Sequence, residues 1–365
     1  MISVICYGCI FKCSRAGGLL VMRKVNIIGG GLAGTALAYM LKSRGAVPII
    51  YEASPDVASG ASGNDIGIYN PRFSAQLDAE AKFYSDAFFK ACSVFEEFGD
   101  DVEFNPCGSL SLLNNERKDV RYRKTVDSWG WSKDDMRIVG AREASDMAGI
   151  EIPHDALYLP KSGSVSPKKL CQLYSKDIEV NLNHKIKDFS ELEGDVTIIA
   201  CGIGALKFEA SENLPLKSVR GQVSFVDQNK LSKNLKLVLN YGGYMAPAKD
   251  GVHVVGSTFQ PWLSHDDILP EDNLINLDKL FEAIPSIEGD YNVVDSRAAV
   301  RTASKNHFPI VGQLGQGLYI SVAHGSHGIL SSIMAASILA DMIVDSDYSA
   351  PYELLTALSP NRFSR

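Results

Sequence analysis

The hydrophobic positions of the chain group into short β-branched runs and longer apolar stretches, and their alternation predicts an α/β protein. The first run covers 25–28 and leads through a glycine-rich turn into a stretch, 35–43, with helical periodicity. A second apolar run follows at 47–51 and ends before Glu52. Strand, glycine turn, helix and strand in this order predict a βαβ unit with parallel strands.

Later apolar runs repeat this theme and add a second kind of sheet. Residues 195–200 are typical of a strand that enters a small-residue turn at Gly202. Residues 317–321 indicate another strand, followed by a helix over 329–344. A mixed antiparallel sheet is predicted from strand-like segments at 222–226, 244–247 and 252–257.

Two weakly charged stretches, 25–41 and 317–340, approach the length of a membrane span. The first is short of the roughly 20 apolar residues that a span needs, and it is broken by Asn26 and four glycines. The second carries His324 and His327 in its middle. Both stretches are more typical of a strand, a turn and a buried helix than of a membrane span. We therefore expect a soluble, cytoplasmic protein without a membrane partner.

Composition excludes several classes of protein. The 365 residues predict about two domains at roughly 150 residues each. The 43 acidic residues outnumber the 36 basic ones and give a net charge of -7, so no chain-wide basic surface indicates nucleic acid or an anionic membrane as a partner. A hydrophobic fraction of 45% and a charged fraction of 22% exclude a disordered or collagen-like chain.

The cysteines and the N-terminal residues carry little chemistry. Seven cysteines are an odd number without regular spacing, so no disulfide framework is expected. Cys6 and Cys9 form a CxxC pair, with Cys13 nearby, but no second pair or neighbouring His completes a zinc site, and no metal is predicted. Residues 1–21 fit a signal peptide poorly, and Met22 directly precedes the first strand. We therefore expect 1–21 to be a non-native or loose extension.

The glycine turn has the spacing GxGxxG. Gly29 permits a tight turn, Gly31 lets the backbone approach a pyrophosphate, and Gly34 lets helix and strand pack closely. The helix N-terminus offers N–H groups to phosphates. In dinucleotide-binding proteins an acidic residue follows the glycine motif at a typical sequence spacing and accepts hydrogen bonds from ribose hydroxyls. Glu52 follows Gly34 at about this spacing. The motif predicts dinucleotide binding; the alternative is a glycine-rich turn without a ligand.

FAD and NAD share this motif, and other segments favour FAD. The strand that ends at Ala200, Cys201 and Gly202 is similar to a second FAD signature that has Thr in place of Cys201. The segment 178–186 is typical of a strand pair that contacts adenine. The loop 324–328 opens a helix whose N-terminus can stabilise the negative charge of a reduced flavin. Three separated cofactor segments imply an interleaved second domain.

On these segments the chain resembles the family of FAD-dependent amine and amino-acid oxidoreductases typified by D-amino-acid oxidase, glycine oxidase and sarcosine oxidase. The resemblance covers nearly everything after Met22. Five segments are more similar to one branch, the FAD-dependent oxidase half of bifunctional proteins of tRNA 5-methylaminomethyl-2-thiouridine biosynthesis. They are ASGNDIGIYNPRFS from Ala61, VRGQVS from Val219, GGYMAPAKDGVHVVGSTF from Gly242, VRTASKNHFPIVG from Val300 and ALSPNRF from Ala357. Proteins of that branch also carry a methyltransferase domain, and no segment of this sequence is long enough to form one. We therefore expect a separate methyltransferase to act downstream.

The resemblance implies a D-amino-acid-oxidase-like fold. A Rossmann-like FAD-binding domain is then interleaved with a substrate domain of α+β class that contains a mixed sheet. The expected boundaries are 22–75, 158–215 and 296–345 for the FAD-binding domain, 76–157 and 216–295 for the substrate domain, and 346–365 for a C-terminal tail.

The resemblance also implies the catalytic residues. Arg301 is expected to pair with a substrate carboxylate, since a guanidinium donates two parallel hydrogen bonds and stays charged; the alternative is a structural pair with an acid such as Asp295. Tyr244 is expected to give the carboxylate a second hydrogen bond, or to be a half-buried sheet tyrosine. Of His324 and His327, one is expected to pack on the edge of the flavin ring and the other to be a structural residue of the turn; the alternative is that either transfers a proton.

The remaining site residues are expected around the cofactor. Asn64 and Arg72 are expected to line the cavity, and Arg220 either to contact flavin or substrate or to support a strand. The residues expected to bind FAD are Gly29, Gly31, Leu32, Ala33, Gly34, Glu52, Ala53, Ala61, Ser62, Gly63, Ile186, Ala200, Gly202, Gly325, Ser326, His327, Gly328 and Ile329.

A tRNA substrate would need local cations despite the acidic balance. The segment 115–124 is rich in Arg and Lys, and aromatic residues near it suit splayed bases; the alternative is a solvated helix face. The residues concerned are Arg117, Lys118, Arg121, Arg123, Lys124, Tyr122, Trp129 and Trp131, with Lys161, Lys168 and Lys169 as a second patch.

Three functions follow in order of preference. The first is removal of the carboxymethyl group from tRNA 5-carboxymethylaminomethyluridine, which leaves 5-aminomethyluridine and releases glyoxylate by hydride transfer to FAD. The second is an oxidase or dehydrogenase of a free small amine such as glycine, sarcosine or a D-amino acid. The third is a nucleotide-binding module without enzymatic activity.

Overall fold

The computed structural model describes residues 23–345 and 350–363, and the expectations for Cys6, Cys9, Cys13 and Met22 lie outside these residues. A six-stranded sheet has the order β15-β16-β9-β1-β2-β8. Its strands are parallel except for β15, which runs antiparallel to β16. The bounds are β1 Lys24–Ile28, β2 Val47–Tyr51, β8 Glu179–Asn181, β9 Val196–Ile199, β15 Ile310–Gly315 and β16 Leu318–Val322.

An eight-stranded sheet has the order β14-β10-β13-β12-β11-β4-β6-β5. Its pairs are antiparallel except that β11 runs parallel to β4. The bounds are β4 Ser109–Leu112, β5 Arg137–Val139, β6 Ala156–Leu159, β10 Leu216–Asp227, β11 Val238–Asn240, β12 Tyr244–Met245, β13 Val252–Gly256 and β14 Val293–Ser304. A small antiparallel pair joins β3 Gly67–Tyr69 to β7 Gly163–Val165.

The helices lie between and around these sheets. Several begin at a side-chain cap that satisfies a free N–H group of the first turn: Asp78 accepts from Ala81 N at 2.8 Å and Asn115 from Lys118 N at 2.9 Å. The bounds are α1 Leu32–Ser43, α2 Ala79–Phe98, α3 Glu116–Trp129, α4 Ala141–Ala148, α5 Pro167–Tyr174, α6 Pro270–Ala283, α7 Gly328–Ala340 and α8 Tyr352–Leu358.

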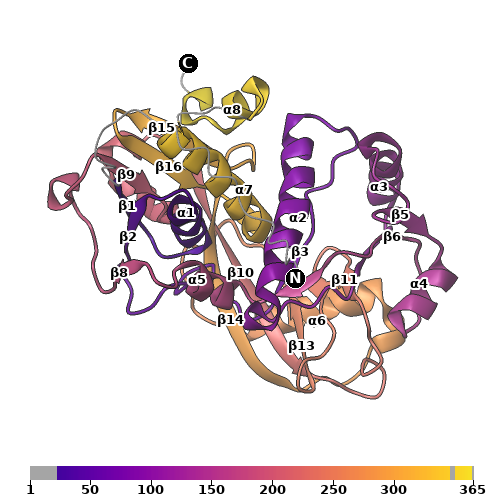
Figure 1. Ribbon diagram of the computed structural model, residues 1–365. Coiled ribbons are helices and arrows are strands. Elements are labelled where there is room, and N and C mark those ends of the chain that lie inside the picture. Colours follow the sequence, from indigo (N-terminus) through magenta and orange to yellow (C-terminus); the bar gives the residue numbers. More distant parts are fainter. Residues whose placement is uncertain (1–22, 346–349, 364–365) are drawn as a thin grey trace, which may run out of the picture.

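Helix α7 is apolar because it is a core helix. The stretch Gly325–Asp345 is long and apolar enough to cross a membrane by length and composition alone. Most of it is buried inside the protein, and α7 packs against α1 and α2 in one hydrophobic cluster. Figure 1 shows the yellow α7 between the indigo α1 and the purple α2. The sequence-based interpretation as strand, turn and buried helix is confirmed for this segment.

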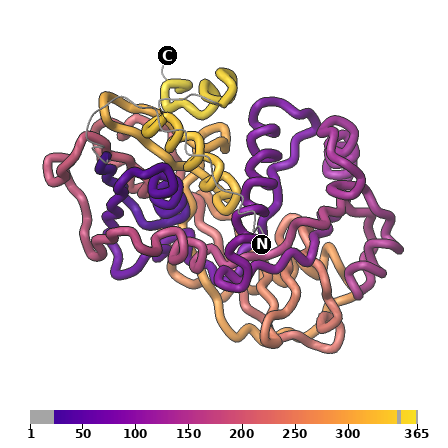
Figure 2. The backbone as a smooth tube through the Cα atoms, viewed as in Figure 1, coloured from indigo at the N-terminus to yellow at the C-terminus, as the bar shows by residue number. Residues whose placement is uncertain are grey.

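The chain passes repeatedly between two parts of the molecule. Figure 2 shows the indigo N-terminal segment, the rose segment of β8 and β9, and the golden segment of β15, β16 and α7 gathered around the parallel sheet. The segments between them form the eight-stranded sheet and its helices. This arrangement is the predicted α/β class with two interleaved units, while the exact domain boundaries stay a prediction.

The structure differs from the sequence-based expectation around residue 186. A strand pair was expected over 178–186, but only β8, Glu179–Asn181, is a strand, and it lies at the edge of the sheet beside β2. Ile186 is buried with Ile28 and Ile199 in an apolar cluster. Its side chain therefore serves packing behind the sheet.

Candidate functional site

A cavity of about 490 Å³ opens at the C-terminal ends of the parallel strands β1, β2, β9 and β16. Ligands of open α/β sheets bind at this edge, because the loops that follow the strands converge there. Most residues expected to bind the cofactor line this one cavity. They are Gly29, Gly31, Leu32, Ala33, Glu52, Ala53, Ala61, Ser62, Ala200, Gly202, Gly325, Ser326, Gly328 and Ile329.

The glycine turn after β1 is shaped by close backbone contacts. Gly29 has a φ of +115°, in the region that favours glycine, and a Cβ there would lie 2.7 Å from the Ala200 carbonyl oxygen. A Cβ at Gly34 would overlap the carbonyl oxygen of Gly29, so only glycine lets α1 lie this close to β1. The N-cap residue of α1, Gly31, has no side chain to cap the helix, which begins at the cavity wall.

Glu52 and Ser62 fix the loops around this turn. The Glu52 carboxylate accepts hydrogen bonds from Gly30 N at 2.7 Å and from Ser54 N at 2.8 Å. Ser62 Oγ accepts from Leu32 N at 3.0 Å. Both side chains also line the cavity. The carboxylate is therefore held in one orientation, where hydroxyl groups of a ligand can reach its remaining lone pairs.

Four residues of the predicted set do not line this cavity. Gly34 and Gly63 lie at tight contacts behind its wall; a Cβ at Gly63 would overlap Ala58 and Arg297. Ile186 lies in the apolar cluster described above. His327 lines a second, smaller cavity instead.

The C-terminal wall of the cavity is the turn Gly325–His327 and the first residues of α7. No side chain caps α7 at its N-terminus. Free N–H groups and the helix dipole therefore give this wall a positive potential. Negative charge that develops on a group in the cavity beside the turn is stabilised.

Arg301 lies where the two cavities meet and lines both of them. Its Nη1 donates to Ser257 Oγ at 3.3 Å and its Nη2 to the Thr258 carbonyl oxygen at 3.1 Å, while its Nε has no partner. No carboxylate pairs with it among the described residues, and Asp295 is exposed and accepts from Ser296 N instead. Burial lowers the pKa of Arg301, yet a guanidinium stays charged. A cation without a charge partner in a cavity favours the binding of an anionic ligand.

Tyr244 lines the larger cavity. It lies on β12 opposite Gly256 of β13, and its carbonyl oxygen accepts from the hydroxyl of Tyr241 at 3.2 Å. Burial raises the pKa of Tyr244 to about 12, although nearby Arg301 acts in the opposite direction. The hydroxyl is therefore protonated at neutral pH and is able to donate a hydrogen bond.

The second cavity has a volume of about 190 Å³ and lies beyond Arg301. His324, Gly325 and Ser326 line it together with Arg301 and also line the larger cavity, so the two spaces share a wall. The remaining lining residues are Arg72, Val219, Phe259, Ala303, His307 and His327. Arg72 thus lies at the second cavity, whereas Asn64 lies at the first, as predicted.

Both histidines near the turn are neutral. Burial lowers the pKa of His324 and of His327 to about 4. His327 Nδ1–H donates to the Asn70 carbonyl oxygen at 3.2 Å, and its ring packs edge-on against Tyr84. His324 lies between two serines, 2.9 Å from Ser331 Oγ and 3.2 Å from Ser321 Oγ. Neither ring is an imidazolium at neutral pH, so neither acts as a cationic acid there.

Sequence reasoning missed Arg297. It lines the larger cavity, where its Nη1 donates to Asn64 Oδ1 at 2.7 Å and its Nη2 to the Gly60 carbonyl oxygen at 2.6 Å. Arg297 and Arg301 are four residues apart on β14, and side chains of a strand share a face at every second residue. That spacing was a usable signal in the sequence.

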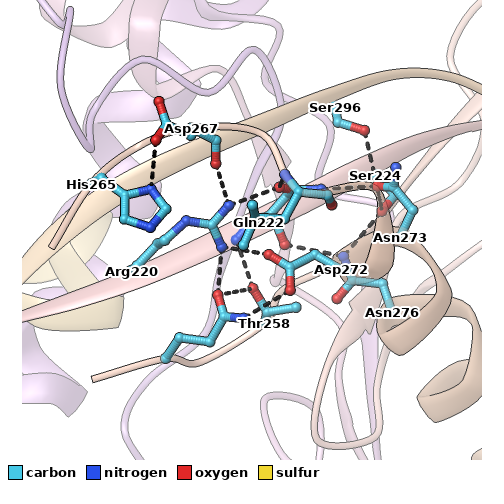
Figure 3. A network of polar contacts seen from close by, with 12 residues as sticks. Arg220, Gln222, Ser224, Thr258, His265, Asp267, Asp272, Asn273, Asn276 and Ser296 are labelled. Carbon is cyan, nitrogen blue, oxygen red and sulfur yellow. Dashed lines mark hydrogen bonds and ion pairs between the residues drawn. The ribbon is translucent and has the colours of Figure 1, made fainter. Parts of the chain in front are cut away.

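Arg220 supports a strand, and the alternative of contact with flavin or substrate is not realised. Its side chain is fully buried and forms an ion pair with Asp272 of α6, as Figure 3 shows. It also donates to Gln260 Oε1, to Gln222 Oε1 and to the Asp267 carbonyl oxygen. This network fastens β10 to α6 on the face opposite the cavities.

Two of the aromatic residues that the sequence suggested for base stacking are buried. Tyr122 and Trp129 are buried in an apolar cluster, and the Trp131 indole N–H donates to Ser85 Oγ at 2.9 Å. Buried rings cannot stack on bases, so the predicted stacking role of Tyr122 and Trp129 was wrong, while phosphate binding by the exposed cations of α3 stays a prediction. Several of the cations are also paired: Arg123 with Asp119 and Asp155, Lys161 with Asp135, Lys168 with Asp65, and Lys169 with Glu103.

No cluster of three or more His, Cys, Asp and Glu side chains suited to a metal ion occurs within 23–345 and 350–363. In that part of the chain the cysteines Cys92, Cys107, Cys171 and Cys201 are free. The chemistry of the site therefore has to be sought in the two cavities and their lining groups.

Comparisons with known proteins agree with this geometry. Residues 24–342 match the family described as "FAD dependent oxidoreductase". The tRNA 5-methylaminomethyl-2-thiouridine biosynthesis bifunctional protein MnmC of Hahella chejuensis is 30% identical over 376 residues, which cover 94% of this chain and 60% of that protein. The chain thus spans about three fifths of the length of this relative.

Solved structures show the same fold. Glycine oxidase from Geobacillus kaustophilus superposes with a TM-score of 0.78 at 21% identity, over 94% of this chain and 100% of that one. Iminodiacetate oxidase from Chelativorans sp. BNC1 has a TM-score of 0.78 at 20% identity, over 92% of this chain and 98% of that one. The two cavities described above lie within this shared fold.

Proposed function

Because the chain belongs to the family of FAD-dependent oxidoreductases, we propose that it oxidises a secondary amine that carries a carboxylate, and that this amine is the 5-carboxymethylaminomethyl group of a tRNA uridine. The products are 5-aminomethyluridine in the tRNA and free glyoxylate. The observation that carries the proposal is the uncompensated guanidinium of Arg301 at the junction of the two cavities.

The residues of the larger cavity fit FAD. The glycine turn leaves the backbone bare where a Cβ would fill the space, and the N-terminus of α1, whose N-cap residue is Gly31, suits a pyrophosphate. The oriented carboxylate of Glu52 suits ribose hydroxyls. The positive wall at the start of α7 suits the flavin ring. When bound there, FAD supplies a two-electron acceptor for hydride from carbon.

The protein's own groups then bind and orient the amine. Arg301 holds the carboxylate, and the Tyr244 hydroxyl donates a further hydrogen bond to it. This places the CH₂ group between carboxylate and nitrogen at the larger cavity, where hydride leaves with its electron pair. Water adds to the resulting C=N bond, and the C–N bond breaks to give glyoxylate and the primary amine. Orientation of this kind supplies much of the rate in such reactions.

The amine has to be neutral to release hydride, and the site favours that state. The charge of Arg301 disfavours a second cation nearby. His324 and His327 are neutral, so neither donates a proton to the amine. The proton of the ammonium form is released to solvent before the reaction.

Two relatives support a substituted amine rather than free glycine. The relative from Hahella chejuensis is named as a protein of tRNA 5-methylaminomethyl-2-thiouridine biosynthesis. Iminodiacetate, the named substrate of one structural neighbour, is a secondary amine with two acetate arms. The second cavity offers this protein space beyond Arg301 for a large substituent on nitrogen. A tRNA substrate implies a cytoplasmic protein and a methyltransferase that acts on its product.

The test uses the FAD-loaded protein and two substrates. It is incubated with tRNA that carries the carboxymethylaminomethyl group and, separately, with glycine; glyoxylate is measured and the nucleosides are analysed. We expect glyoxylate and 5-aminomethyluridine from the modified tRNA and no product from unmodified tRNA. Glyoxylate from glycine with unchanged tRNA would favour the oxidase of small amines. A colourless protein that takes up no FAD would leave only the nucleotide-binding module.

A further inference from the structure

The two cavities lie along one face of the β10–β14 ladder. On β10 this face carries Val223 and Gly221 at the larger cavity and Val219 at the smaller one. Lys217 comes two residues before Val219, and side chains two apart on a strand point to the same side. Lys217 therefore stands at the end of this face, on the side of the second cavity.

Phe259 is held at the second cavity in an exposed position. Its ring lines the cavity, yet 51% of the residue is open to solvent. No aromatic partner for it occurs among the described residues. An apolar ring at the mouth of a cavity is available for a flat ligand.

The backbone on either side of Phe259 is fixed. Gln260 N donates to the Arg220 carbonyl oxygen at 2.9 Å, and Thr258 N to the Gln222 carbonyl oxygen at 3.1 Å. The Gln260 side chain bonds to Arg220 and Asp272 inside the buried network of Figure 3. Neighbouring side chains of an extended segment point to opposite sides, so this anchor turns Phe259 toward the cavity.

Unpaired cations lie beside this mouth. Ala303 lines the second cavity and is the register partner of Lys217, and Lys305 follows it by two residues. Both lysines are exposed, and neither forms an ion pair with any residue that the structure describes. Unlike Arg123, Lys161, Lys168 and Lys169, which form ion pairs, they can bind phosphates without breaking one.

We propose that Phe259 is the stacking platform for the uracil ring of the substrate and that Lys217 and Lys305 bind the phosphates that flank it. This assignment rests on the proposed tRNA substrate. In this arrangement the substrate carboxylate binds Arg301, and the arm that links the substrate nitrogen to the uracil passes along the second cavity. The uracil ring lies at the mouth of that cavity and stacks on Phe259. Stacking on an aromatic ring is the usual way in which proteins hold a base that has left its helix.

The test compares variants of the FAD-loaded protein with two substrates, modified tRNA and free 5-carboxymethylaminomethyluridine. Phe259→Ala is expected to raise KM about 5- to 100-fold for both substrates, since both carry the base. Phe259→Tyr, which keeps a flat ring, is expected to restore most of the loss. Lys217→Ala with Lys305→Ala is expected to raise KM for tRNA only and to lower the salt dependence of tRNA binding by about one unit of slope per lost phosphate contact.

Tyr352→Ala is the matched control, because Tyr352 is an exposed aromatic residue that lines neither cavity. Its kinetics should equal those of the wild type. If the wild type oxidises modified tRNA but Phe259→Ala behaves like Tyr352→Ala, the platform is wrong and the proposed function stands. If the wild type oxidises glycine and leaves both uridine substrates unchanged, both the proposed function and the stacking role of Phe259 are wrong.

Discussion

The guanidinium of Arg301 occupies the space in which a side chain of residue 221 would lie, and Gly221 leaves that space open. A Cβ at Gly221 would overlap Arg301 Nη2 and would lie 2.7 Å from the Thr258 carbonyl oxygen. Gly221 faces the cavity from β10, and Arg301 faces it from the neighbouring strand β14, opposite Val219. The absence of a side chain at Gly221 thus sets the position of the Arg301 guanidinium.

Replacement of Gly221 tests this relationship. Gly221→Ala is expected to displace the guanidinium and to raise KM for a carboxylated amine at least about tenfold, which corresponds to roughly 1.4 kcal/mol. Gly315→Ala is a suitable control, since nothing lies within 4 Å of a Cβ at that position. Steady-state kinetics and FAD content are measured for both variants. Equal KM values for the two would show that the cavity adapts to the methyl group.

Removal of the guanidinium itself should have a larger effect. Arg301→Ala is expected to keep FAD bound and to raise KM for the amine by a factor of tens to thousands, since losing one partner of a buried charge pair costs about 2 to 5 kcal/mol. Arg301→Lys, which keeps the charge but not the paired donors, should recover only part of this loss. Arg117→Ala, an exposed change on α3, is the control. Wild-type kinetics for Arg301→Ala would make Arg301 a structural residue.

The orientation of Glu52 predicts its share in cofactor binding. Glu52→Gln removes the charge that accepts from Gly30 N and faces the cavity. A hydrogen bond to a charged group contributes about 1.5–3 kcal/mol, so the dissociation constant of FAD should rise roughly 10- to 100-fold. Fluorescence titration of the apoprotein with FAD measures it. Glu193→Gln, at a side chain 93% exposed, should bind FAD like the wild type; if Glu52→Gln does so too, the carboxylate does not contact the cofactor.

The two neutral histidines predict how stability depends on pH. Burial lowers the pKa of both from 6.5 to about 4, so between these values the unfolded chain binds more protons than the folded one. The free energy of unfolding should therefore fall as the pH is lowered from about 6.5 toward 4. Urea unfolding over this range should show that His324→Gln and His327→Gln each reduce the slope by up to about one proton. Slopes equal to that of the wild type would mean that folding does not lower the pKa of either ring.

The Arg220–Asp272 pair predicts a stability effect away from the cavities. Asp272→Ala leaves a fully buried guanidinium without its charge partner and should lower the free energy of unfolding by about 3–5 kcal/mol. Asp267→Ala, an exposed carboxylate in the same segment, should change it by less than about 1 kcal/mol. The double variant Arg220→Met with Asp272→Leu should recover part of the loss. A small effect of Asp272→Ala would show that water reaches Arg220.

The N-terminal half of the site was predictable because its signals are local. The glycine spacing, the two apolar runs and Glu52 lie within one βαβ unit. The contact that requires Gly34 lies inside that unit, whereas the contacts at Gly29 and Gly31 are with Ala200 and Ser62 outside it. Arg301 and Tyr244 came from the family resemblance, and the structure places both at one cavity. Their roles stay a prediction.

The parts that sequence reasoning got wrong depend on distant contacts. Arg220 pairs with Asp272, which lies 52 residues later in the chain, and the sequence around Arg220 does not indicate that partner. Trp129 and Tyr122 looked like base-stacking residues because cations surround them, yet Tyr122, Thr125 and Trp129 have the spacing of one helix face and form the buried side of α3. Phe259 was missed because its position at the cavity is set by the pairing of Gln260 with β10.

The central claim is that the flavin is reduced by the carboxymethyl group on tRNA. The most direct measurement mixes the oxidised holoprotein, without oxygen or another acceptor, with an equimolar amount of tRNA carrying 5-carboxymethylaminomethyluridine, and follows the flavin absorbance and the glyoxylate formed. We predict loss of the yellow colour, glyoxylate in proportion to the reduced flavin, and no change with unmodified tRNA. Flavin that stays oxidised with the modified tRNA but is reduced by glycine would contradict the claim.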